Sequence, residues 1–137
     1  MKVIGIEIDK KRAIFYILEK DGQDNITNLT GKTKYISIND DKNNLELQHF
    51  QKEMFELFDH HNPDKITILS RQTKGRFAAS SVSFKLEALI QCYHKVEIKF
   101  LSKPALASYY KKNSFTLKCD NSYQINACQV ANILVHT

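Results

Sequence analysis

Proline and glycine are scarce in this sequence, with two Pro and four Gly among 137 residues, and tryptophan is absent. This composition excludes collagen-like and Pro/Gly-rich low-complexity chains, and a hydrophobic share of 42% excludes a wholly disordered one. No apolar run approaches the roughly 20 residues of a membrane helix. The sequence opens on a strand-like segment, with no basic-then-apolar leader before it. We therefore expect one domain over residues 1–137, cytoplasmic and without a membrane partner.

Metal-ligating and nucleophilic side chains are few as well. Cys92, Cys119 and Cys128 cannot all pair, and their spacings match no zinc pattern. We expect them to be reduced thiols that pack as small apolar residues. The adjacent His60 and His61 point apart on a helix, so they are expected to interact with the dipole at a helix end. No cofactor is predicted from these residues.

Acidic residues are depleted in the second half of the chain. Residues 1–64 carry nine Lys/Arg and twelve Asp/Glu, a net charge of −3. Residues 65–137 carry eleven Lys/Arg and three Asp/Glu, a net charge of +8. Such asymmetry is typical of a domain with one basic face, as in proteins that bind nucleic acid or phosphate. A lysine-rich solvated surface is the simpler alternative.

The first forty residues predict strands. In residues 3–8 the isoleucines at 4, 6 and 8 fall on one face, and Gly5 and Glu7 fall on the other. A short charged turn leads to a second strand over 13–18, which predicts an antiparallel hairpin. The polar stretch 21–30 is expected to be a loop, and residues 33–38 a third strand.

Helices and strands then alternate. Apolar residues at helical spacing predict a helix over 47–58, with Asn43 or Asn44 as its N-cap and Asn62-Pro63-Asp64 as its end. Further strands are expected over 65–69 and 96–101, and helices over 77–93, 104–112 and 123–135. The order β-β-β-α-β-α-β-α-α predicts an α/β protein with a mixed five-stranded sheet and helices on both faces. This is the element order of the ribonuclease H-like fold.

A basic loop follows the fourth predicted strand. Arg71, Lys74 and Arg76 would lie at the carboxyl end of that strand, where open α/β sheets bind ligands. Gly75 is next to the start of a helix, whose free amides favour an anion. We predict that these residues and Lys85 contact the phosphates of nucleic acid. The Walker spacing is absent, and a solvated basic turn is the alternative.

The most distinctive segment runs from Thr73 to Gln91. Together with Gly5-Ile6-Glu7, this segment resembles an uncharacterised bacterial family, domain of unknown function 3010. That family is similar to a compact RuvC Holliday-junction resolvase of the ribonuclease H-like superfamily. The resemblance covers nearly the whole chain and implies the ribonuclease H-like fold. It supplies no function.

The superfamily holds two divalent ions with carboxylates on the first strand, at the end of the fourth strand and on the last helix. In this resemblance Glu7 takes the first-strand position. The other positions fall at Ser70 and at Ile125 or Asn126, which carry no charge. The resemblance therefore implies a depleted set of acids, and Mg or Mn would be needed only by a nuclease.

Three hypotheses follow. The first is a nucleic-acid-binding protein, of DNA or RNA, that is not an active nuclease. The second is a metal-dependent nuclease or resolvase in which Glu7 is catalytic and binds metal with substitutes such as Asp9, Asp120 or Glu46. The third is a non-catalytic module for protein interaction, for example a homodimer. Glu87 is expected on the surface of its helix.

Overall fold

A mixed sheet of six strands lies at the centre of the molecule, in a computed structural model that describes residues 1–71 and 80–137. The strands are β1 (Lys2–Asp9), β2 (Arg12–Lys20), β3 (Ile26–Asn28), β4 (Tyr35–Ser37), β5 (Lys65–Leu69) and β6 (Ile98–Leu101). Their order is β3-β2-β1-β5-β6, and β4 pairs with β2 as well. β2 is antiparallel to β1, whereas β5 and β6 run parallel to it. The predicted mixed α/β sheet is confirmed.

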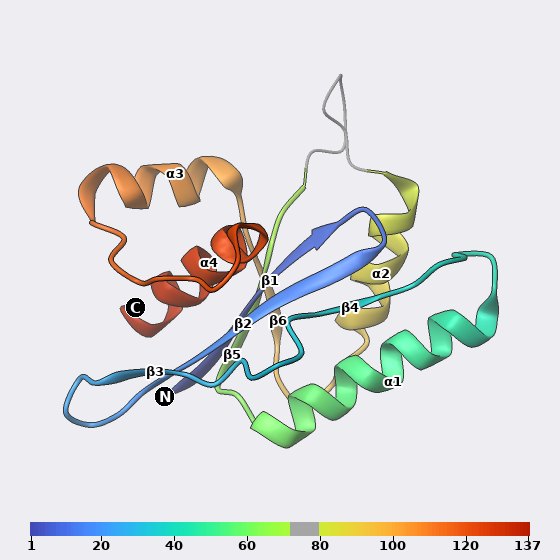
Figure 1. Cartoon of the computed structure of the whole chain (residues 1–137), viewed down its shortest axis with the longest axis horizontal. Helices are drawn as coiled ribbons and strands as arrows, with labels where there is room; N and C mark the ends of the chain where they lie inside the picture. Colours follow the sequence, from blue (N-terminus) through green and yellow to red (C-terminus); the bar gives the residue numbers. More distant parts are fainter. Residues whose placement is uncertain (72–79) are drawn as a thin grey trace.

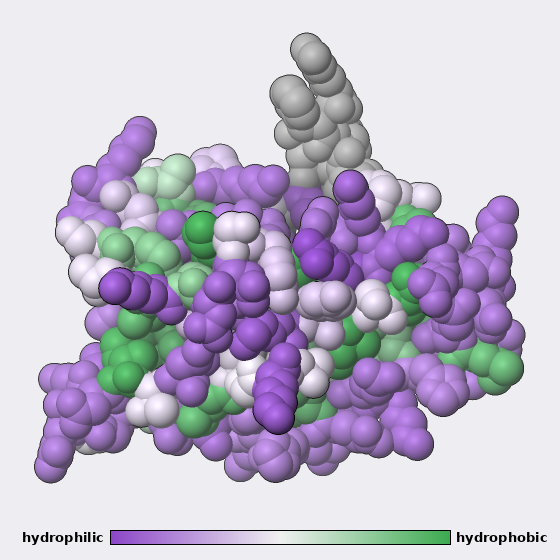
Figure 2. Space-filling model, viewed as in Figure 1, coloured by the Kyte–Doolittle hydropathy of each residue, from purple (hydrophilic) through white to green (hydrophobic). Residues whose placement is uncertain are grey.

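Helices cover both faces of this sheet. They are α1 (Asn44–His61), α2 (Ser81–Gln91), α3 (Lys103–Lys112) and α4 (Ile125–Val135), with a 3-10 turn η1 (Ser122–Gln124) before α4. Figure 1 shows α1 and α2 on one side of the sheet and α3 and α4 on the other. Among the described residues, none of the helices has both the length and the hydropathy of a membrane span. Figure 2 shows that hydrophilic side chains cover most of one face, with hydrophobic ones in small groups between them.

The alternation in β1 separates two hydrophobic cores, as predicted. The first core lies under α1 and α2 and contains Ile4, Ile6, Ile8, Phe15, Phe50, Phe58, Leu86 and Ile90. The second lies under α4 and contains Val3, Ile14, Tyr16, Leu18, Ala127, Cys128, Ala131 and Val135. Because Gly5 and Glu7 share the face of Val3, both point toward α4.

β4 lies within the third predicted strand, and an additional strand, β3, makes the sheet six-stranded rather than five-stranded in the described residues. β3 lies inside the stretch 21–30 that the sequence predicts as a loop, so that prediction is wrong. Between β3 and β4, the buried Thr30 accepts a hydrogen bond from the Ile17 N–H at 3.0 Å, and Gly31 turns the chain with φ of 73°. β3 carries little hydrophobic signal because only Ile26 of its residues is partly buried.

Capping residues set the helix ends. The Asn43 side chain accepts from two amides in the first turn of α1, and Asn62 ends this helix in the left-handed conformation, with φ of 49°. Ser80 caps α2 by accepting from the Ser83 N–H, and the helix begins at residue 81; residues 77–79 of the predicted helix lie outside the described residues. The last helix, α4, begins at residue 125 after the 3-10 turn, rather than at 123.

Gly5 allows α4 to cross the sheet closely. A Cβ atom at Gly5 would lie 2.6 Å from the Ala131 nitrogen and nearer still to the Ala127 carbonyl oxygen. Any larger residue would push the helix away from β1. The close approach brings the first turn of α4 beside Glu7, two residues further along the strand.

Candidate functional site

Glu7 and Asn126 meet at the carboxyl end of β1. The Asn126 side-chain Nδ2 donates a hydrogen bond of 2.6 Å to Glu7 Oε2. Glu7 comes from β1, and Asn126 from the first turn of α4, which the small Gly5 draws onto the sheet. The pair thus joins two segments that lie 119 positions apart in the sequence.

Burial raises the pKa of Glu7 above its ordinary value of 4.5. The hydrogen bond from Asn126 acts in the opposite direction, because it stabilises the carboxylate. The nearby negative charge of Asp9 raises the pKa further, whereas the positive charges of Lys103 and Arg12 lower it. The net result is a carboxyl group that ionises less readily than an exposed glutamate.

An open pocket of about 410 Å³ lies over this pair. Its lining residues are Glu7, Asp9, Ile14, Ser122, Tyr123, Ile125 and Asn126. They come from the β1–β2 hairpin on one side and from η1 and α4 on the other. The pocket therefore combines two carboxylates, an amide and two hydroxyls with apolar and aromatic walls.

Arg12 and two tyrosines form a cluster beside the pocket that the sequence does not predict. The guanidinium carbon of Arg12 lies 5.0 Å from the ring centre of Tyr35 and 4.8 Å from that of Tyr123. The two rings are 5.7 Å apart and meet edge to face. Arg12 also forms an ion pair of 3.4 Å with Asp9. The three residues come from β2, β4 and η1, so no local sequence pattern could reveal the cluster.

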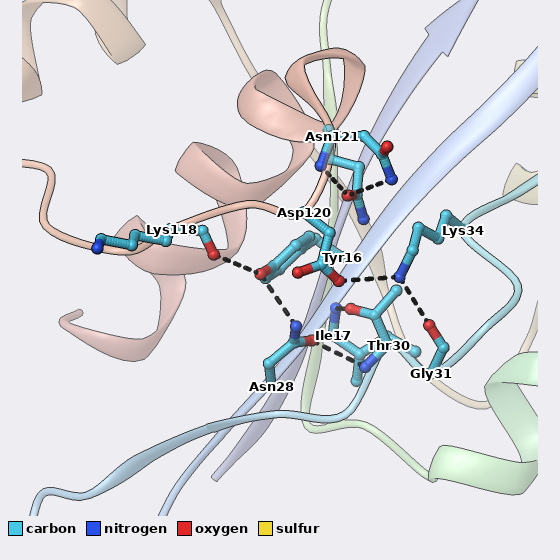
Figure 3. Close-up of polar contacts among 10 residues, drawn as sticks. Tyr16, Ile17, Asn28, Thr30, Gly31, Lys34, Lys118, Asp120 and Asn121 are labelled. Carbon is cyan, nitrogen blue, oxygen red and sulfur yellow. Dashed lines mark hydrogen bonds and ion pairs between the residues drawn. The ribbon is translucent and has the colours of Figure 1, made fainter.

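Polar contacts hold the chain before η1 against β2 and against the segment before β4. The Tyr16 hydroxyl accepts from Asn28 Nδ2 at 3.0 Å and donates to the Lys118 carbonyl at 3.5 Å (Figure 3). Lys34 Nζ lies 3.3 Å from Asp120 Oδ2. The Gln124 side chain accepts from the Asn121 N–H at 3.0 Å. These contacts place Ser122 and Tyr123 at the pocket.

The basic residues that were predicted to contact phosphates differ in their exposure to solvent. Arg71 is not a solvent-facing cation, because its side chain is 7% exposed and its Nη2 lies 2.7 Å from Glu87 Oε1. The same guanidinium lies 4.3 Å from the ring centre of Phe84. Glu87 is correspondingly only 15% exposed and faces Arg71 instead of lying in solvent on the helix surface, which corrects the expectation for that residue.

Lys85 is half-exposed, but its Nζ lies 2.8 Å from Asp41 Oδ2, so that a carboxylate already compensates its charge. Lys74, Gly75 and Arg76 lie outside the described residues. The exposed cations at this edge of the described structure are Lys10 and Lys11, in the β1–β2 turn, and Lys103, which follows β6.

The cysteines and histidines match the sequence prediction in part. Cys128 is buried in the core under α4, and Cys119 packs against the same core. Cys92 is exposed, so it does not pack as an apolar residue. His60 and His61 lie in the last turn of α1, as expected, but the centres of their rings are 4.9 Å apart and the rings meet edge to face, so they do not point apart.

Comparison with known proteins identifies the family. The model of the family described as "Protein of unknown function (DUF3010)" matches residues 1–134. The chain belongs to this family. No curated protein matches it. The resemblance noted in the sequence is thereby confirmed.

The DUF3010 chain shares its fold with Holliday junction resolvases of known structure. RuvC of Thermus thermophilus has a TM-score of 0.68 at 10% identity, over 96% of this chain and 91% of that chain. The yeast mitochondrial Holliday junction resolvase has a TM-score of 0.55 at 17% identity, over 83% and 56%. The fowlpox virus resolvase, in complex with Holliday junction DNA, has a TM-score of 0.53 at 12% identity, over 99% and 97%. At these identities the likeness shows a RuvC-like, ribonuclease H-like fold.

The residues at this site of the DUF3010 chain do not fit the two metal ions that such a fold implies. Divalent ions of this kind need several anionic oxygen ligands. Here Glu7 is hydrogen-bonded to a neutral amide, and Ser70 at the end of β5 carries no charge. Within residues 1–71 and 80–137, no group of three or more His, Cys, Asp or Glu could hold a metal.

The acids considered as substitutes are engaged elsewhere. Asp9 is paired with Arg12, and Asp120 with Lys34. Glu46 accepts from the backbone N–H groups of residues 39 and 40, before α1. Of the three, Asp9 alone lines the pocket with Glu7. The structure thus brings together two of the acids that were predicted as metal ligands, and leaves Asp120 and Glu46 apart from them.

Proposed function

We propose that this DUF3010 protein binds nucleic acid at the edge of the sheet that carries Glu7, and that it does not cut the phosphodiester backbone. The observation that carries the proposal is the Glu7–Asn126 hydrogen bond. A RuvC-like nuclease site needs a cluster of carboxylates to hold its metal ions, and this hydrogen bond pairs one carboxylate with a neutral amide instead.

The geometry of the sheet gathers cations at this edge. β1, β5 and β6 are parallel, so their carboxyl ends lie at one edge. Lys10 and Lys11 follow β1, and Lys103 follows β6. Lys74 and Arg76 belong to the connection after β5, and we propose them, with Gly75, as further phosphate contacts on their sequence alone. Cations in this arrangement attract the phosphate backbone.

Similarity of fold supports the choice of partner. RuvC of Thermus thermophilus has also been solved in complex with a Holliday junction substrate, with a TM-score of 0.67 and 8% identity to this chain. The net charge of +8 over residues 65–137 is consistent with a polyanionic partner. Nucleic acid is therefore the partner that fold and charge both favour.

Fluorescence anisotropy with labelled four-way junction, duplex and single-stranded DNA and RNA tests the binding. We expect an affinity that falls as the salt concentration rises, because phosphate contacts release counterions. If the protein binds none of these probes at low salt, the proposal is contradicted and a module for protein interaction is favoured. Size-exclusion chromatography with light scattering would then show whether the protein forms a homodimer.

A cleavage assay tests the second part of the proposal. The same junction is incubated with the protein in Mg²⁺ or Mn²⁺, and with the Glu7→Gln variant under identical conditions. We expect the junction to remain intact in both. Metal-dependent cleavage by the natural protein that Glu7→Gln abolishes would instead establish the nuclease hypothesis.

A further inference from the structure

We infer that the pocket beside Glu7 receives an unpaired nucleobase that carries an exocyclic amine. This inference rests on the proposed binding of nucleic acid, and it names the ligand of the same edge of the sheet. We call this pocket the base pocket; it is lined by Glu7, Asp9, Ile14, Ser122, Tyr123, Ile125 and Asn126.

The volume and walls of the base pocket suit a nucleobase. A volume of about 410 Å³ lies within the range of small-molecule sites. The Tyr123 ring and the Ile125 side chain supply its apolar surface, above the buried Ile14. Ile125 is 41% exposed, so apolar surface at the mouth is open to a ligand. A nucleobase could therefore cover apolar surface there and keep its polar edge for the inner groups.

The hydrogen-bonding groups of the base pocket are rich in acceptors. Asn126 occupies Glu7 Oε2, which leaves Glu7 Oε1 to accept another hydrogen bond. No cation among the described residues forms an ion pair with Glu7. Burial raises the pKa of Glu7, so its carboxylate lacks full compensation from solvent. A partly buried carboxylate with one neutral partner favours a ligand that donates N–H groups. The exocyclic amines of cytosine, adenine and guanine are such donors.

The cluster of Arg12, Tyr35 and Tyr123 adds a stacking surface. Tyr35 is 40% exposed, and the ion pair with Asp9 holds the Arg12 guanidinium against both rings. Aromatic rings and guanidinium groups both stack with bases of single strands. Tyr123 belongs both to the cluster and to the base pocket. Two consecutive bases of one strand could therefore bind together, one in the pocket and the next stacked on the cluster.

The distribution of charge favours a base in the pocket over a phosphate. Glu7, which forms no ion pair within the described residues, would repel a phosphate placed in the pocket, whereas the charge of Asp9 is compensated by Arg12. The exposed cations Lys10, Lys11 and Lys103 lie at the same edge of the sheet instead. A strand whose phosphates contact these lysines could direct an unstacked base inward, toward the carboxylates.

Binding of labelled homopolymers to the full chain at pH 8 tests the inference. We expect oligo(dC) to bind more tightly than oligo(dT), because thymine lacks an exocyclic amine. The Glu7→Ala variant should remove that preference. The Tyr123→Ala variant should weaken binding of oligo(dC) at least about fivefold, whereas Tyr123→Phe retains the ring and the affinity. Phe100→Ala is the matched control, since Phe100 is 42% exposed on β6 and does not line this pocket.

The outcomes separate the two proposals. Salt-dependent binding with equal affinities for oligo(dC) and oligo(dT), unchanged in Tyr123→Ala, would overturn the base pocket and leave nucleic-acid binding in place. No binding of any oligonucleotide at low salt would overturn both. Circular dichroism of each variant shows whether it is folded, and the conservative Tyr123→Phe replacement keeps the test valid if Tyr123→Ala fails to fold.

Discussion

Ionisation of Glu7 costs free energy, because the fold removes part of its carboxyl group from water. The pKa of Glu7 in the folded protein lies above the ordinary value of 4.5. Well below that value the group is protonated in the folded and the unfolded protein, so its ionisation does not affect stability. As the pH rises through the folded pKa, the folded state loses stability relative to a protein with a neutral group at this position.

Replacement of Glu7 by glutamine should therefore stabilise the protein at neutral pH. Glutamine keeps an oxygen that can accept from Asn126 but carries no charge. We expect Glu7→Gln to raise the Tm at pH 7.5 and to have no effect well below pH 4.5, as measured by circular dichroism. Glu53→Gln on the exposed side of α1 is the control. A lower Tm at pH 7.5 would mean that Asn126 and Lys103 more than compensate the cost of burial.

At the scale of the elements, the Arg71–Glu87 ion pair joins the end of β5 to α2. Both side chains are removed from water, at 7% and 15% exposed, and Phe84 packs against the guanidinium. Loss of one member leaves an uncompensated buried charge, which costs about 3–5 kcal/mol in comparable pairs. The exposed Lys95–Asp59 pair, at 55% and 46%, contributes about 0–1 kcal/mol.

Urea unfolding of single and double variants tests this role. We expect Glu87→Met to lower the free energy of unfolding by about 3–5 kcal/mol. Adding Arg71→Met should restore part of that loss, because the double variant leaves no buried charge. Lys95→Met is the control and should change stability by less than about 1 kcal/mol. A double variant less stable than Glu87→Met alone would show that Arg71 stabilises the fold independently of Glu87.

At the scale of the whole molecule, charge is divided unequally along the chain, with −3 over residues 1–64 and +8 over residues 65–137. The parallel arrangement of β1, β5 and β6 brings the segments after these strands to one edge. Long-range attraction of a polyanion to that edge depends on ionic strength, because salt screens it and competes for the phosphates.

The salt dependence of binding measures how many cations contact phosphates. We expect the Lys74→Ala and Arg76→Ala double variant to reduce the slope of log K against log[salt] by about two for duplex DNA. Lys42→Ala with Lys52→Ala, from the acidic half of the sequence, should leave the slope unchanged. An unchanged slope for the first pair would exclude Lys74 and Arg76 from the interface.

Local pattern predicted the elements with strong periodicity and missed those without it. The isoleucine face of β1 was predicted correctly, Asn43 was one of the two N-caps expected for α1, and the helix ends at the expected segment that begins with Asn62, because each of these features depends on neighbouring residues. β3 was missed because it has three residues, of which only Ile26 packs against the core, and so it has no hydrophobic alternation. Arg71 was expected in solvent, since charge in a loop predicts exposure, and its partner Glu87 is 16 positions away in the sequence.

The sequence by itself determined the order of the main elements, the charge of each half and the family, since these depend on composition, spacing and motif. Only the tertiary structure decided which side chains meet. Glu7 and Asn126 are 119 positions apart, and they form a hydrogen bond because Gly5 lets α4 lie close against β1. Arg12, Tyr35 and Tyr123 likewise converge from three elements. Contacts of this kind are set by how helices pack on the sheet, which no local pattern encodes.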